Sequence, residues 1–468
     1  MLLFNYYYDI PTSFPTLNVT SVYYLAFIFV SSILLYFFNK SIIRKIIIFL
    51  LSLLFIWSFS NDFYFVIVSL LFCIYGYIVS YLIKHNKIVL IISILIPVVA
   101  LVALKENLLS NSLIVPLGIS FYVLRLIWYF NYIYSGKIEK RKSFLSLSNY
   151  LIFFPSYIAG PIENPITFFD EESKNEAVSY LNLKKGWVRL LYGIFEKVVI
   201  CDYFGLLVER ILPAPDITGI SVFIGIVLYS FQIYLDFDSY SNIALGSASI
   251  IGIELNENFK TPYLSKNIKE FWSRWHISLS TWLKENIYIP LGGNKKGNIR
   301  KIINVVIVFV VSGLWHGSAF HFVLWGLAHA LIRIIEDFIE SKFPKLISNK
   351  VVSIFRIAIN FLIVTFVWLL FRYENITEVT CLLSRLFVPS QTAFKDLLSN
   401  HEYIWMLILI VFVIVIDLIR YKFDIYRFIG KSFFIFRFAI YLIFIIAFLI
   451  FGVYGGTFEP SDFIYRWF

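Results

Sequence analysis

The sequence predicts an all-α, polytopic membrane protein with about 11 or 12 membrane-spanning helices. Of its 468 residues, 59% are hydrophobic and only 15% are charged, a more apolar composition than water-soluble proteins usually have. We interpret residues 1–468 as one transmembrane domain, with a motif-rich core at 115–336 and a tail at 454–468. Polar segments between the apolar runs predict re-entrant or interfacial helices around a central tunnel.

Apolar runs of about 20 residues are long enough to cross a bilayer as helices. The run at 302–336 is either one long helix or a hairpin broken between Gly313 and Gly317. The expected crossings lie near residues 20–38, 42–58, 62–83, 88–104, 113–134, 186–212, 219–253, 302–336, 351–371, 402–420 and 433–453.

Basic residues gather in short loops at alternate ends of these runs, and the formal net charge is +10. By the positive-inside rule these loops face the cytoplasm, as does the block at 255–300, and both termini face outward. The basic residues form no continuous face, so we exclude nucleic acid as a partner. Membrane lipid is the expected surrounding. The basic loops are 40–45, 84–87, 137–142, 184–185, 342–350 and 420–431.

Two stretches are too polar to span a membrane and too apolar to be ordinary loops. One is Tyr150–Glu163, which is interrupted by Pro155 and by Gly160-Pro161; the other is the block at 255–300. Irregular backbone at membrane depth is tolerated only where it is buried in protein or lines a cavity. Polar groups in such surroundings are costly unless they are used or paired, so the second stretch is where we expect function.

Five motifs follow one another along the middle of the chain. They are PLGISFY (116–122), FFPSYIAGPIE (153–163), YSFQIYLDFDSYSNIALG (229–246), FWSRWHISLSTWLKENIYIPLGGNKKG (271–297) and SGLWHG (312–317) followed by FVLWGLAHA. Taken in this order they resemble the membrane-bound O-acyltransferase family, in particular its bacterial alginate-acetylating branch. The resemblance is dense over about residues 115–330. Arg125 and Asn131 depart from that branch and leave the donor and acceptor open.

The resemblance implies transfer of an acyl group, usually acetyl, from a cytoplasmic thioester to a hydroxyl acceptor across the membrane. His316 matches the family's essential histidine, and a neutral imidazole with a pKa near 6.5 can take the acceptor's proton. Gly313 and Gly317 beside it are expected to allow close approach of a substrate. His276 matches the histidine of the family's RWH motif and is expected to orient the thioester, polarise its carbonyl or complete a proton path.

Further site residues are expected around these two histidines. Asp236 lies in the family's DF motif, and Asp236 and Asp238 both need partners inside the membrane, for which Arg274 is a candidate. Neither an HExxH spacing nor a converging Cys/His set is present, so we expect no metal site and no bound cofactor. We interpret GGNKKG as a tight turn after a short amphipathic helix. The donor side is expected to use Arg274, Trp275, Lys284, Lys295 and Lys296, and the tunnel Asp236, Trp315 and His329.

The last residues form an F-x-Y-x-x-F pattern at Phe463, Tyr465 and Phe468. The pattern is similar to a tail motif of some of these acyltransferases, in which the tyrosine is a proposed acyl relay, so Tyr465 is a third catalytic candidate; the alternative is an aromatic interfacial anchor. The donor is expected to be acetyl-CoA or the thioester of an acyl-carrier protein. An extracytoplasmic acetyltransferase or glycan synthase is the expected partner, in a bacterial plasma membrane.

Two other functions remain open at this stage. D-alanyl transfer to teichoic acid is the close alternative, and a glycan or lipid-linked flippase is the alternative of another class.

Overall fold

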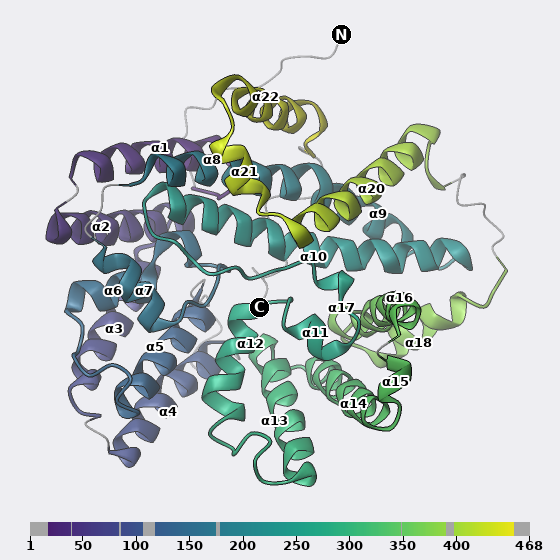
Figure 1. The fold of residues 1–468 in the computed structure, drawn as a ribbon, viewed down its shortest axis with the longest axis horizontal. Coiled ribbons are helices and arrows are strands. Elements are labelled where there is room, and N and C mark those ends of the chain that lie inside the picture. The colour runs from purple at the N-terminus through teal and green to yellow at the C-terminus, as the bar shows by residue number, and fades with distance from the viewer. Residues whose placement is uncertain are drawn as a thin grey trace.

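The computed structural model describes residues 17–38, 40–83, 86–105, 118–174, 178–347, 349–389 and 397–453, and the regular structure of these residues is helical (Figure 1). The all-α prediction is confirmed. The N-terminal helices are α1 (Val22–Phe37), α2 (Ser41–Ser60), α3 (Phe63–Ser80), α4 (Lys87–Lys105), α5 (Ile119–Tyr134), α6 (Phe144–Ile152), η1 (Phe154–Ser156) and α7 (Pro165–Ser173).

The second half of the chain begins with an interrupted helix and continues with short elements before the next long helices. These elements are α8 (Tyr180–Phe195), η2 (Glu196–Cys201), α9 (Asp202–Ile211), α10 (Ile220–Ile250), η3 (Pro262–Leu264), α11 (Ile268–Trp272), α12 (Ile277–Leu283), η4 (Lys284–Tyr288), α13 (Asn298–His316), α14 (Phe320–Lys342), α15 (Pro344–Ile347), α16 (Lys350–Val367), α17 (Leu369–Arg372), α18 (Ile376–Arg385), α20 (Asn400–Lys422), α21 (Ile425–Lys431) and α22 (Phe434–Phe451).

Among the described residues, 8 helices are long and apolar enough to cross a membrane, so the chain is an integral membrane protein. The other expected crossings correspond to α1, α5, α8 with α9, and α14, which are shorter or more polar. Helix α5 is buried along almost its whole length. A helix enclosed by protein can carry polar groups that lipid would penalise, and α5 carries Arg125 and Asn131.

The 31-residue helix α10 lies across the middle of the molecule, with α20–α22 along one side of it and α11–α14 along the other (Figure 1). It packs most extensively against α8, and against α9 and the wide π-turn η2 that joins these two helices. Most of its side chains are buried. Helix α10 is therefore the axis against which the elements of the candidate site are placed.

The expected crossing at 302–336 is a hairpin of α13 and α14, broken after His316. Two glycines let these helices touch backbone to backbone. A Cβ on Gly313 would lie 2.2 Å from the carbonyl oxygen of Phe322, and one on Gly326 would lie 2.3 Å from that of Phe309. A Cβ on Gly317 would meet the Phe322 ring at 2.5 Å. The expectation that Gly313 and Gly317 make room for substrate is wrong, because the neighbouring helix takes that room.

The segment Tyr150–Glu163 is irregular and buried in protein, as its proline and glycine breaks predict. Helix α6 ends at Ile152, and the carbonyls released beyond it need donors because water is excluded. Arg125 of α5 supplies them, with its own side chain fully enclosed. It donates to the backbone carbonyl oxygens of Tyr150 (3.3 Å), Leu151 (3.1 Å), Ser156 (2.7 Å) and Pro161 (3.2 Å).

Candidate active site

His316 is the last residue of α13 and is buried at the crossing with α14. Aromatic rings surround its imidazole. Trp325 of α14 and Phe371 of α17 meet it edge-on, with ring centroids 5.3 Å and 5.1 Å away, and Phe322 is stacked at 6.3 Å. This packing holds the ring of the matched family histidine in one orientation, in a site that excludes bulk water.

His276 is buried just before α12 and caps that helix with its own side chain. Its ring Nδ1 accepts a hydrogen bond from the backbone N–H of Leu279 at 3.4 Å. Ser278 lies beside the same nitrogen, with its Oγ at 3.5 Å. Burial lowers the pKa of His276 to about 3, so its imidazole is neutral at physiological pH.

Trp315 contacts both histidines. Its ring centroid is 4.8 Å from that of His316 and 6.0 Å from that of His276, with the rings at 69° and 79°. The two imidazoles are close enough to interact electrostatically. Two histidines that are 40 positions apart in the sequence therefore meet at one aromatic side chain.

Lys105 was not anticipated by sequence reasoning, yet it reaches this site from the end of α4. Its Nζ donates to the backbone carbonyl of Trp315 at 3.1 Å, and its charge acts on His316. That carbonyl belongs to the last turn of α13, where helical carbonyls lack intrahelical donors. One signal was available: a lysine closes the apolar run 88–104 at the end that the positive-inside rule assigns to the outside, where basic residues are uncommon.

His329 lies one layer further along α14, inside a box of aromatic side chains. Among the described residues neither of its ring nitrogens has a hydrogen-bond partner, and its side chain is fully buried. Trp275, expected on the donor side, is also buried and packs against Trp368 with ring centroids 4.8 Å apart. The rings around His329 belong to Phe271 (6.4 Å), Trp272 (5.1 Å), Phe309 (5.9 Å), Trp325 (5.0 Å) and Trp368 (6.2 Å).

Asp236 and Asp238 are paired as expected, but not with Arg274. Two residues along a helix correspond to about 200° of rotation, so the two carboxylates leave opposite sides of α10 and need separate cations. Lys197 of η2 binds Asp236 at 2.7 Å, and Arg420 of α20 forms a two-pronged pair with Asp238. All four side chains are buried. The suggestion of Arg274 is corrected, because it forms an ion pair with Glu270 at 2.7 Å.

The other residues expected on the donor side lie around a turn. Arg274 stacks on the ring of Tyr421 at 4.8 Å, whereas Lys284, Lys295 and Lys296 are exposed. The chain at 289–296 is a turn after the short helix η4, with Gly292 and Gly293 at positive φ, which confirms the interpretation of GGNKKG. Three exposed ammonium groups, one on η4 and two in the turn after it, can attract an anionic partner.

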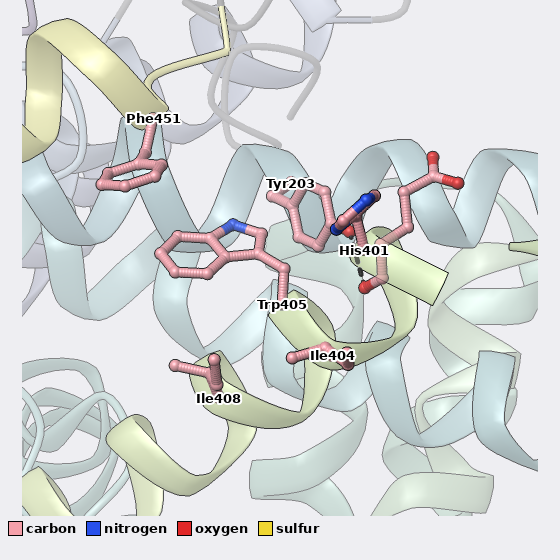
Figure 2. A pocket seen from close by; sticks show the side chains of 7 residues that line it. Tyr203, His401, Ile404, Trp405, Ile408 and Phe451 are labelled. Atoms are coloured by element: carbon pink, nitrogen blue, oxygen red, sulfur yellow. Dashed lines mark hydrogen bonds between the residues drawn. The ribbon is translucent and has the colours of Figure 1, made fainter. Parts of the chain in front are cut away.

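A cavity of about 390 Å³ lies elsewhere, between α9, α20 and α22 (Figure 2). Figure 2 shows Trp405 with Phe451 on one side of it and Tyr203 and His401 on the other. None of its lining residues is a candidate site residue. The described residues contain no group of three or more His, Cys, Asp or Glu side chains that could hold a metal ion. Tyr465 lies outside the described residues.

The membrane-spanning helices and the two buried histidines beside Trp315 define an integral membrane protein with a polar site enclosed by aromatic side chains. A family model for the membrane-bound O-acyltransferases matches residues 3–377. The chain belongs to that family, as its motifs predict.

Curated relatives match part of the chain. The probable alginate O-acetylase AlgI of Pseudomonas fluorescens is 34% identical over 273 residues, which are 58% of this chain and 54% of the relative. The peptidoglycan O-acetyltransferase of Helicobacter pylori is 33% identical over 299 residues, covering 58% and 56%. The teichoic acid D-alanyltransferase of Bacillus subtilis is 30% identical over 281 residues, covering 56% and 69%. The match with the first two spans about half of each relative's length.

Proposed function

We propose that the protein is an O-acyltransferase that moves an acetyl group across the membrane. The donor is a cytoplasmic thioester, and the acceptor is a hydroxyl of an exported polysaccharide or cell-envelope glycan. The observation that carries the proposal is the burial of His316 at the α13–α14 crossing, with His276 buried against the same Trp315 ring. Membership of the acyltransferase family, and relatives named for O-acetylation, supply the reaction class.

His316 is the general base in this proposal. As the acceptor oxygen attacks the thioester carbonyl carbon, the His316 imidazole takes the hydroxyl proton. The tetrahedral intermediate then collapses, the carbon–sulfur bond breaks, and the proton passes from His316 to the leaving thiolate. The products are an ester and a free thiol, and the enzyme returns to its starting state without a metal or redox step in this scheme.

The donor side follows from the charge pattern. The exposed side chains of Lys284 in η4 and of Lys295 and Lys296 in the turn lie on the side that the positive-inside rule assigns to the cytoplasm. Ammonium groups there suit the phosphates of coenzyme A or the acidic surface of an acyl-carrier protein, which are the two donors we consider. In this orientation the protein is a multi-pass component of a bacterial plasma membrane with both termini outside.

On the acceptor side, Tyr465 is proposed to relay the acyl group. With the C-terminus outside, Tyr465 would take the acyl group after its phenol loses a proton to His316, and would pass it to an extracytoplasmic acetyltransferase or to the glycan. Mass mapping of the protein after incubation with acetyl-CoA alone tests this step. An acetyl group on Tyr465 is expected, and full activity of Tyr465→Phe in cells would remove the relay.

A second candidate function is D-alanyl transfer to teichoic acid, favoured by the likeness to the Bacillus subtilis enzyme. A carrier protein charged with D-alanine, offered in parallel with acetyl-CoA, separates the two. A flippase is the remaining alternative, and it predicts glycan transport that His316→Ala leaves intact.

The central experiment measures thioester consumption and acyl transfer by purified protein in lipid. His316→Ala is expected to lower turnover by about 10²- to 10⁴-fold, the usual range for loss of a general base. His401→Ala is the matched control, because this histidine is exposed at the separate α9–α20–α22 cavity. Equal turnover in wild type and His316→Ala, with the control unchanged, would refute the enzymatic proposal.

A further inference from the structure

Helix α21 connects two of the helices that are long and apolar enough to cross the membrane. Helix α20 ends at Lys422 and α22 begins at Phe434, so residues 423–433 form the whole connection between them. Within α22 only Arg437 is buried in protein, and lipid therefore covers the rest of that helix in a membrane. A connection this short between two crossings keeps α21 at the surface of the bilayer.

One face of α21 is fixed to the protein. Tyr426, Ile429 and Gly430 are buried on this face. A Cβ on Gly430 would lie 3.2 Å from the backbone nitrogen of Lys185, so α21 and α8 pack closely where they lie side by side (Figure 1). The guanidinium of Arg189 in α8 also covers the Tyr426 ring, 4.7 Å from its centroid. These contacts determine which face of α21 points away from the protein.

The opposite face carries two cations beside an aromatic ring. Arg427 and Lys431 are exposed and lie one helical turn apart, and the neighbouring Phe428 is 67% exposed. Asp424 caps the helix by accepting from the backbone N–H of Arg427 at 3.0 Å, and no carboxylate of the described residues forms an ion pair with either cation. Like charges at this spacing repel each other, so an anion from outside the chain would stabilise the helix.

Large apolar side chains flank the two cations, and a third cation lies close by. Lys422, at the end of α20, is exposed. Basic side chains beside exposed aromatic rings are typical of a helix that lies in the membrane interface, where the rings enter the acyl region and the cations reach the phosphates. The exposed rings on either side of α21 belong to Phe423 (67%), Phe433 (68%) and Phe434 (67%).

We infer that the outer face of α21, formed by Lys422, Arg427, Phe428 and Lys431, is a binding site for an anionic phospholipid. The headgroup phosphate binds between Arg427 and Lys431, and the acyl chains pack against Phe428 and the neighbouring phenylalanines. By the positive-inside rule the site faces the cytoplasmic leaflet. An acidic protein would suit the cations but not the exposed rings. The site lies beyond residue 377, where the family match ends, and it does not depend on the proposed acyl transfer.

Lipid binding to the purified protein tests the inference. The full chain in detergent is titrated with phosphatidylglycerol or with zwitterionic phosphatidylcholine of the same acyl chains, and native mass spectrometry counts the bound lipid. Combined Arg427→Gln and Lys431→Gln removes both cations at exposed positions, where substitutions change stability little. Each basic side chain near an anionic surface contributes about fivefold in affinity. The double variant should therefore bind phosphatidylglycerol about 25-fold more weakly and phosphatidylcholine as wild type does.

Combined Lys345→Gln and Lys350→Gln is the matched control, because it removes the same charge from exposed positions on the same side of the membrane. This control should keep the wild-type preference for phosphatidylglycerol. Phe428→Ala should weaken binding of both lipids, since it removes an apolar contact and no charge. The inference is overturned if the α21 double variant keeps the wild-type preference, which is the result expected for an acidic protein partner. It is also overturned if the control loses as much affinity, because net charge alone would then explain the binding.

Discussion

Substitution of Gly326 by alanine tests the geometry that holds His316 in place. The added Cβ would lie 2.3 Å from the carbonyl oxygen of Phe309, whereas carbon and oxygen normally approach to about 3.3 Å. Helices α13 and α14 must then separate by about 1 Å. Because the obstructing atom belongs to the backbone and cannot rotate away, we expect a loss near the upper end of the overpacking range of about 1–3 kcal/mol.

The same separation should affect activity. Trp325, the neighbour of Gly326, contacts the His316 ring, and a displacement of about 1 Å in a catalytic group can lower the rate about 10²-fold. Thermal unfolding followed by intrinsic fluorescence, together with kcat per folded protein, measures both effects. Leu327→Ala is the control, since that side chain is 38% exposed on the same helix and should change stability by no more than about 0.5 kcal/mol. If Gly326→Ala matched this control in melting temperature and kcat, the close helix crossing would not be what positions His316.

Two further substitutions test cations that bind groups inside the protein. Lys105→Met removes the donor to the Trp315 carbonyl and is expected to lower kcat about tenfold at unchanged donor KM, since hydrogen bonds from charged groups contribute about 1.5–3 kcal/mol. Lys105→Arg should restore most of the rate. Equal kcat in wild type and both variants would exclude a positioning role for Lys105. Arg420→Met removes the cation that pairs with the buried Asp238 carboxylate and should destabilise the fold by about 3–5 kcal/mol, measured in thermal melts. Addition of Asp238→Asn to this variant should recover much of that loss. A double variant as unstable as the single one would contradict the pairing.

Much of this protein could be predicted from local sequence alone. The apolar runs, the proline and glycine breaks at Tyr150–Glu163 and the turn at GGNKKG depend on residues within a few positions of one another, and the structure confirms each of them. The order of the motifs was sufficient to predict the family, because each motif is a contiguous stretch that can be recognised without knowledge of the fold. The need of Asp236 and Asp238 for partners also followed from their place inside an apolar helix.

The partners themselves depended on contacts between distant segments. Lys197 and Arg420, which bind the two aspartates, and Lys105, which reaches the Trp315 carbonyl, lie 39, 182 and 210 positions away from the residues they contact. Gly313 shows the same limit: its sequence neighbours suggested space for a substrate, whereas helix α14 fills that space.

The sequence by itself therefore determined a helical membrane protein of the acyltransferase family and the histidines to look for. Only the tertiary structure decided what surrounds those histidines. Periodicity and motif spacing report on one helix at a time, whereas the aromatic surroundings of His276 and His316 and the pairing of buried charges depend on which helices touch. Those contacts are governed by packing and by the need to satisfy every polar group where water is excluded.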